Sequence, residues 1–156
     1  MRLIAHRGNL RGPDSARENR KDYLDAALDA GFDAELDIWV VKNQLFLGHD
    51  GPHYPVELDW VCERIENLWI HCKNVEALEV MDGTGLNYFF HDNDAYTLTS
   101  NGFIWTFPKQ KLAQQNAVAV WLEPQDPRSG DDFSLAEAIC GDYVGLWGLS
   151  LTLGSR

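Results

Sequence analysis

Short apolar segments rich in strand-forming residues alternate with polar or helix-forming segments along most of the chain. Eight segments have the length and composition of β-strands. They are Leu3–Arg7, Asp33–Lys42, Gln44–Gly48, Leu68–Lys73, Tyr88–His91, Phe103–Phe107, Ala117–Glu123 and Ala138–Tyr143. Because strand-like and helix-like segments take turns, the pattern predicts a parallel sheet covered by helices.

Three segments have helical character. The clearest is Ala16–Ala30, where Ser15 and Glu18 fit a capping box in front of an apolar stripe. The segments Val56–Ile65 and Val75–Met81 are shorter. Together with the strands, these helices predict an α/β fold.

The length of the chain limits that fold. The chain has 156 residues, whereas (β/α)₈ barrels usually need at least ~200. No repeat or linker divides the sequence, so we expect one domain over residues 1–156. We expect a compact, incomplete TIM-type (β/α) barrel in which some helices are reduced to turns.

The charge balance narrows the range of partners. The chain has 24 acidic and 13 basic residues, a formal charge of −11. Binding to nucleic acid needs clustered basic residues, so a nucleic-acid partner is not expected. No apolar stretch approaches the ~20 residues of a membrane span. The three widely spaced cysteines are typical of reduced thiols, which predicts a cytoplasmic location.

Two acidic residues stand out within an otherwise apolar strand. Glu35 and Asp37 are two residues apart, so their side chains point to the same side of the strand, opposite Leu36 and Ile38. Two buried carboxylates this close repel each other unless one is protonated or a cation lies between them. The pair therefore predicts a site for a divalent cation.

Polar residues also follow two of the predicted strands directly. His6-Arg7-Gly8 follows the first strand, and Gly48-His49-Asp50 follows the third. Histidine exchanges protons near neutral pH, and arginine offers paired donors to a phosphate group. The active sites of barrel enzymes lie at such strand ends.

The order of these motifs resembles the glycerophosphodiester phosphodiesterase family, whose first third reads His-Arg-Gly, Glu-Asn, a Glu-x-Asp strand and a strand ending in His-Asp. Here the motifs are His6-Arg7-Gly8, Glu18-Asn19, Glu35-Leu36-Asp37 and His49-Asp50, within about fifty residues. The resemblance implies a phospholipase-C-like phosphodiesterase fold and a role in phospholipid metabolism. It also leaves the role of Glu18 open, since this residue lies either near the site or in the capping box.

The resemblance implies a role for each matching residue. His6 and His49 would be the general acid and base, in an order that the sequence leaves open. Arg7 would contact phosphate, as would Lys73 in the strand Leu68–Lys73. Glu35 and Asp37 would be metal ligands.

The sequence departs from the family at His71, which replaces the usual third carboxylate. His71 shares a strand face with Lys73, so it either completes the metal site or forms only a hydrogen bond. Nitrogen at this position favours Mg²⁺, Mn²⁺ or another transition ion over Ca²⁺. The family's usual insertion after His49-Asp50 is absent, so the identity of the substrate cannot be inferred from the family.

We expect a metal-assisted hydrolase acting on a glycerophosphodiester-like or related small phosphodiester. A cation would polarise a phosphoryl oxygen while the two histidines move protons. One alternative is a non-catalytic module that binds a phosphate ligand on the same scaffold. Another is an enzyme acting on a different phosphorylated metabolite or glycan.

Overall fold

A computed structural model describes residues 1–129 and 133–153 of the chain. Its strands are β1 (Arg2–Ala5), β2 (Asp33–Val41), β3 (Gln44–Leu47), β4 (Tyr54–Val56), β5 (Leu68–Cys72), β6 (Tyr88–Phe89), β7 (Tyr96–Leu98), β8 (Ile104–Thr106), β9 (Ala117–Val120) and β10 (Ala136–Gly141). Its helices are η1 (His6–Gly8), α1 (Lys21–Asp29), α2 (Leu58–Cys62), α3 (Val75–Met81), η2 (Pro127–Ser129) and α4 (Val144–Leu153).

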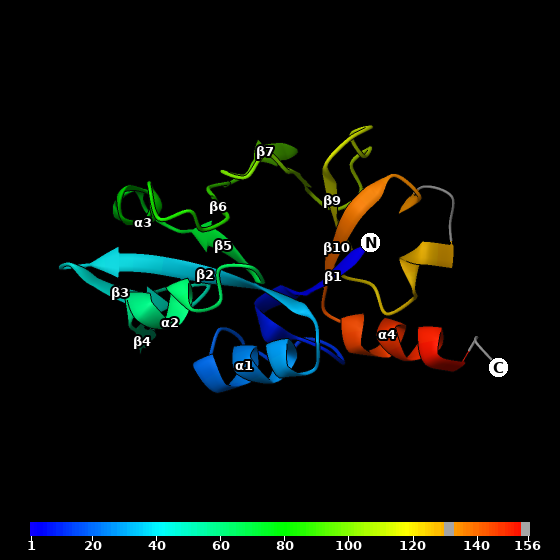
Figure 1. Ribbon diagram of the computed structural model, residues 1–156, viewed down its shortest axis with the longest axis horizontal. Helices are drawn as coiled ribbons and strands as arrows, with labels where there is room; N and C mark the ends of the chain where they lie inside the picture. Colours follow the sequence, from blue (N-terminus) through cyan, green and yellow to red (C-terminus); the bar gives the residue numbers. More distant parts are fainter. Residues whose placement is uncertain (130–132, 154–156) are drawn as a thin grey trace.

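All these strands belong to one curled sheet (Figure 1). Strand β1 lies between β2 and β10, and the parallel series runs β6–β5–β2–β1–β10–β9–β8. Three antiparallel strands are added to it. The hairpin β3–β4 extends from the far end of β2, and β7 pairs with β8.

The prediction of a TIM-type barrel is wrong. The sheet is an open, mixed half-barrel, and helices do not alternate with its strands. Between the end of α3 at Met81 and the start of α4 at Val144, the described residues contain no α-helix. The expected phospholipase-C-like phosphodiesterase fold, which is a closed barrel of that type, is therefore not what this chain forms.

The sequence between residues 90 and 116 explains the difference. It is rich in turn-forming residues, including Asp92-Asn93-Asp94 and Asn101-Gly102. Gly102 has a φ of 83°, in the left-handed region, where it lies in the turn that joins β7 to β8. A hairpin therefore forms where a barrel would need a crossover helix.

Side-chain hydroxyls bridge the gap that this hairpin leaves beside β6. The backbone N–H of Tyr88 donates to Oγ of Ser100 at 2.9 Å, and that hydroxyl donates to the carbonyl of Leu86. The hydroxyl of Thr97 donates to the carbonyl of Phe90 at 2.9 Å. Together with one backbone hydrogen bond, from the N–H of Ser100 to the carbonyl of Tyr88 at 2.8 Å, these hydroxyl contacts take the place of a continuous backbone ladder.

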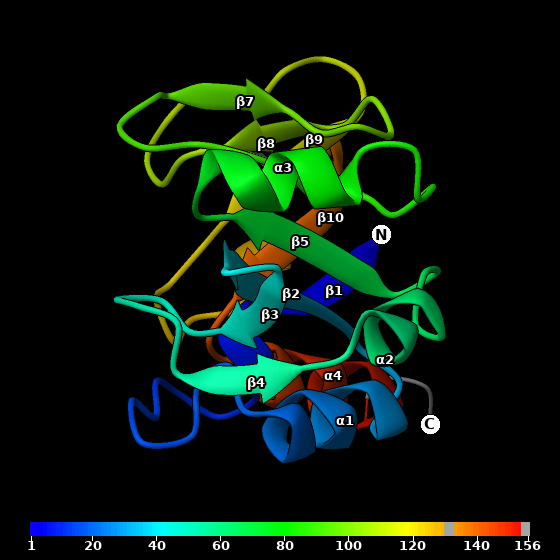
Figure 2. The same cartoon turned by 90° about the vertical axis from the view of Figure 1, so that its left-hand side faces the viewer.

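The core is divided between the two faces of the sheet. On the outer face, Leu36 and Ile38 of β2 are fully buried beneath helical residues such as Leu24 and Met81. Figure 2 shows α3 lying along β5, with α1 and α4 on the other side of the molecule. The inner face holds a separate cluster, including Trp69 and other apolar residues of β1, β6, β8, β9 and β10.

The predicted elements agree with the structure in position more than in type of connection. Each of the eight predicted strands overlaps an observed one, and the predicted helix Val75–Met81 is α3. Strands β4 and β7 and helix α4 were not predicted. None of the helices in the described part of the chain has the length and apolar character needed to cross a bilayer.

Candidate functional site

All the residues that the sequence singled out for chemistry line one pocket of about 420 Å³. They are His6, Arg7, Glu35, Asp37, His49, His71 and Lys73. These residues lie in or just after β1, β2, β3 and β5, at the carboxyl ends of β1, β3 and β5 and along the inner face of β2. The curled sheet therefore brings together segments that are up to 67 residues apart, from His6 to Lys73.

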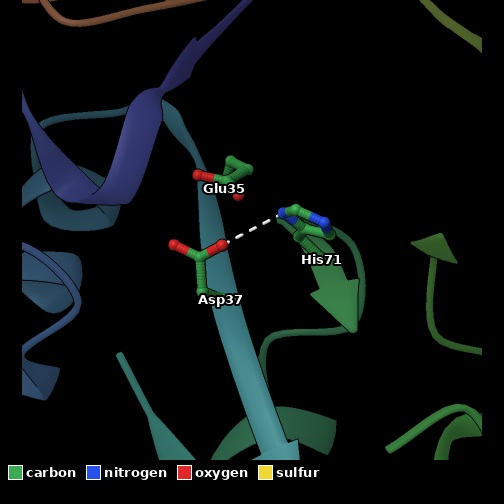
Figure 3. A group of neighbouring side chains, drawn as sticks. All are labelled: Glu35, Asp37 and His71. Carbon is green, nitrogen blue, oxygen red and sulfur yellow. Dashed lines mark ion pairs between the residues drawn. The ribbon is translucent and has the colours of Figure 1, made fainter. Parts of the chain in front are cut away.

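Three of these residues, Glu35, Asp37 and His71, are close neighbours on β2 and β5 (Figure 3). The register of β2 and β5 pairs Asp37 with His71, so the two side chains emerge next to each other. One ligand atom from each of the three residues lies within 4.8 Å of the others, and all three residues are buried. Nδ1 of His71 is 3.0 Å from Oδ1 of Asp37.

The surroundings shift the pKa values of the two carboxyl groups in opposite directions. Burial raises the pKa of Glu35, and the nearby charge of Asp37 raises it further. Burial also acts to raise the pKa of Asp37, but His71, Arg7 and Lys73 outweigh it and hold that pKa well below its ordinary value. Asp37 is therefore the permanent anion of the pair, while Glu35 needs a positive charge beside it to ionise fully.

The hydrogen bond on the far side of the His71 ring determines what faces Asp37. Nε2 of His71 lies 3.0 Å from the carbonyl oxygen of His91, so Nε2 carries a hydrogen and donates it. In the neutral ring, Nδ1 then presents a lone pair to Oδ1 of Asp37. That oxygen is buried and has no partner with hydrogen-bond geometry among the described residues. Either a proton or a cation must therefore lie between the two atoms.

His6 is oriented by a carboxylate from the other end of the chain. Its Nδ1 lies 2.8 Å from Oδ1 of Asp142, and its Nε2 lies 4.0 Å from Oε2 of Glu35. With Nδ1–H donating to Asp142, the free Nε2 is directed toward Glu35. Burial lowers the pKa of His6, but the hydrogen bond to Asp142 and the charge of Glu35 outweigh it, so the pKa is raised.

Arg7 and Asn19 hold the acidic pair in place through hydrogen bonds, and both residues have left-handed backbone conformations. Their φ angles are 53° and 63°, which non-glycine residues rarely adopt. The backbone N–H of Arg7 donates to Oε2 of Glu35 at 3.1 Å. The Asn19 side chain both donates to Oδ2 of Asp37 and accepts from its backbone N–H. Strain of this kind is typical of functional sites.

The position of Glu18 settles the two alternatives left by the sequence. Its Oε2 accepts from Arg7 at 3.2 Å and its Oε1 accepts from Asn9 at 2.8 Å. Helix α1 begins only at Lys21, and its N-cap makes no side-chain hydrogen bond. The predicted capping box of Ser15 and Glu18 is therefore wrong, and Glu18 instead lies beside the pocket, where it contacts Arg7.

His49 and Lys73 also line the pocket. Nδ1 of His49 is 2.6 Å from Oδ1 of Asp50, and the His49 side chain is 41% exposed. Nζ of Lys73 lies 3.5 Å from Oδ1 of Asp37. Gly48 has a φ of 146°, and a Cβ there would collide with the carbonyl of Gly51. Only glycine fits this turn, which places His49.

Sequence reasoning missed Asp142 and the direct role of Asn19. The signal for Asp142 was its position, because it follows β10 directly, just as His6 follows β1. These two strands are parallel neighbours with Ala5 opposite Gly141, so the residues after each are adjacent. Asn19 belongs to the Glu18-Asn19 motif, but nothing in the sequence revealed its contact with Asp37.

Compared with known proteins, the chain matches no family model, and no curated protein or solved structure is significantly similar to it. The resemblance to the glycerophosphodiester phosphodiesterase family therefore rests on the four short motifs alone.

Proposed function

We propose that this protein is a metal-assisted hydrolase of a small phosphodiester, of the glycerophosphodiester kind or related to it. The observation that supports this most directly is the contact between Asp37 and His71. Oδ1 of Asp37 is buried, has no partner with hydrogen-bond geometry among the described residues, and lies 3.0 Å from Nδ1 of His71. Neighbouring ligands of an octahedral ion with bonds of about 2.1 Å lie about 3.0 Å apart.

The donor set fits a divalent cation. Two carboxylates and one imidazole suit Mn²⁺ or another transition ion better than Ca²⁺, which prefers a larger set of oxygen ligands. Glu35, Asp37 and His71 would hold the ion, and its positive charge would favour the ionised form of Glu35. When bound, such an ion polarises a phosphoryl oxygen and offsets the charge of the phosphodiester.

The two histidines are suited to proton transfer. Asp142 fixes the ring of His6 so that Nε2 is the nitrogen free to exchange a proton. His49 faces the same pocket and is partnered by Asp50. One histidine removes a proton from the attacking oxygen as the new P–O bond forms. The other supplies a proton to the leaving alkoxide as the old P–O bond breaks.

The remaining cations differ in how free they are to bind phosphate. The guanidinium of Arg7 is shared between Glu18 and Asp37, at 3.2 and 3.3 Å. Among the described residues, Lys73 forms a single ion pair, the longer contact of 3.5 Å to Asp37. Lys73 is therefore the better candidate for binding a phosphate oxygen, while Arg7 chiefly holds the carboxylates in place.

A combined binding and turnover experiment tests the proposal. Calorimetric titration with Mn²⁺ should show one site in the unmodified protein, and none in Glu35→Gln. The matched control is Asp29→Asn, which removes an exposed carboxylate on α1 and should bind as the unmodified protein does. Turnover of glycerophosphodiesters and of bis(p-nitrophenyl) phosphate should require the ion and stop with EDTA.

Two results would contradict the proposal in different ways. No binding of Mn²⁺, Mg²⁺ or Ca²⁺ at millimolar concentration would remove the metal. Metal and phosphate-ester binding without any turnover would favour the alternative function, a non-catalytic module that binds a phosphate ligand.

A further inference from the structure

A second cavity of about 590 Å³ adjoins the candidate site and is larger than the site pocket. The two share Phe107 and Val120 as lining residues. Phe107 follows β8 and Val120 ends β9. Both cavities therefore border the carboxyl ends of these strands, the same end of the sheet at which His6 and His71 lie.

The larger cavity lies over a part of the sheet where the described segment between β8 and β9 forms no helix. Val118 and Val120 of β9 pack on the inner cluster, whereas Ala119 and Trp121 face the outer side. The segment 107–116, which follows β8, contains no helix. Outer-face apolar surface is consequently left open, and Leu135 on its wall is 55% exposed.

This cavity also carries two cationic side chains. Lys109 and Lys111 line it, both are exposed, and neither forms an ion pair with any residue that the structure describes. Acidic residues outnumber basic ones 24 to 13 in this chain, and Arg2, Arg17 and Arg64 are all paired with them. Two lysines beside an apolar wall make the cavity complementary to an amphiphilic anion.

We propose that this cavity holds the leaving-group part of the substrate, and that this part is an apolar body bearing a second anionic group. The apolar body lies against Trp121 and Leu135, and the anionic group lies at Lys109 and Lys111. The assignment rests on the proposed function, since it needs the phosphodiester group at the pocket of Glu35 and Asp37. It narrows the substrate class to phosphodiesters of anionic, largely apolar alcohols.

Two fluorescent probes of nearly the same shape test the cavity without requiring catalysis. Anilinonaphthalene sulfonate is an aromatic anion, and N-phenyl-1-naphthylamine lacks its sulfonate. The double variant Lys109→Gln with Lys111→Gln should weaken sulfonate binding about fivefold or more, as expected for losing two exposed charge contacts. Its affinity for the neutral probe should be unchanged. The control is Lys42→Gln, an exposed lysine in the β2–β3 turn, which should alter neither affinity.

A third variant tests the apolar wall. Leu135→Asp should weaken binding of both probes, and circular dichroism should show an unchanged fold because the residue is largely exposed. The sulfonate should also compete with bis(p-nitrophenyl) phosphate, raising its KM in the unmodified protein but much less in the double lysine variant.

The outcomes separate this proposal from the proposed function. Glu35→Gln should retain sulfonate binding, because the cavity does not include that residue. Equal sulfonate affinity in the double lysine variant and the unmodified protein would overturn the cavity assignment, as would an equal loss in Lys42→Gln. Metal-dependent turnover could survive either result, whereas absent turnover with intact probe binding would contradict the hydrolase alone.

Discussion

The two sides of the pocket have opposite chemistry. The charged or titratable side chains that line it, such as His6, Asp37 and His71, all come from the part of the chain up to Asp92. The lining that comes from later residues is apolar: Trp105, Phe107, Pro108, Val120 and Leu122. The sheet therefore places a polar, metal-compatible side opposite an apolar side.

The packing behind the two sides differs in the same way. Behind the charged side, β2 is buried from Asp33 to Ile38 and helices α1, α2 and α3 pack on its outer face. Behind the apolar side, β7, β8 and β9 are joined by turns and loops. Rigid packing supports groups that must be held within a few tenths of an ångström. An apolar binding wall tolerates a looser frame.

The largest expected effect is on the free energy of unfolding of variants on the charged side. Replacing Asp37 and replacing Glu35 should change it in opposite directions. Asp37→Asn leaves Arg7 and Lys73 without their buried anion, which should cost about 3–5 kcal/mol of unfolding free energy. Glu35→Gln should raise it, because burial and the charge of Asp37 disfavour ionised Glu35. Urea unfolding at neutral pH with EDTA measures both. Equal losses in the two variants would mean that the acids share one environment.

The next effect is on catalysis. His6→Ala and His49→Ala should each lower kcat by about 100-fold or more, since each histidine moves a proton in the reaction. The matched control is His53→Ala, an exposed histidine outside the pocket lining, which should keep normal turnover. Near-normal kcat in either site variant removes that histidine from the mechanism.

A smaller effect should appear when Asp142 is replaced, because it positions His6 and touches no substrate. Asp142→Asn should lower kcat about tenfold. It should also lower the pKa of His6, whose raised value depends on this contact. The acid limb of the pH–rate profile should then shift to lower pH if neutral His6 is the active form.

The same variant has a stability signature with a defined sign. A raised folded-state pKa means that protonated His6 stabilises the fold. That stability is fully present below the ordinary value of about 6.5 and is lost as pH rises through the folded-state pKa. The stability difference between the unmodified protein and Asp142→Asn should therefore be larger at acidic pH than at alkaline pH. A difference that does not vary with pH would contradict the link to His6.

The sequence predicted the individual strands and their faces better than it predicted how the strands are connected and paired. The alternation in β2 correctly placed Glu35 and Asp37 on the inner face, opposite Leu36 and Ile38, because side-chain direction in a strand is set locally. The barrel was wrong because closure depends on what each connection becomes. Likewise Asp142 reaches His6 only through the pairing of β1 with β10, which no local pattern encodes.

The smallest expected effect concerns the seam where the charged and apolar sides of the sheet meet beside β6. There the hydroxyl of Ser100 accepts from the N–H of Tyr88 and donates to the carbonyl of Leu86. Ser100→Ala removes both bonds at an exposed position, so it should cost only about 1 kcal/mol of global stability. Local opening should increase more visibly, because the amide of Tyr88 loses its acceptor. Hydrogen exchange at that amide should speed up, while exchange in β2 stays unchanged. The control is Ser15→Ala, an exposed serine far along the chain from this seam. Unchanged exchange at Tyr88 in Ser100→Ala would mean that packing and the backbone hydrogen bond from the N–H of Ser100 to the carbonyl of Tyr88 join the two sides, and that the hydroxyl contacts are incidental.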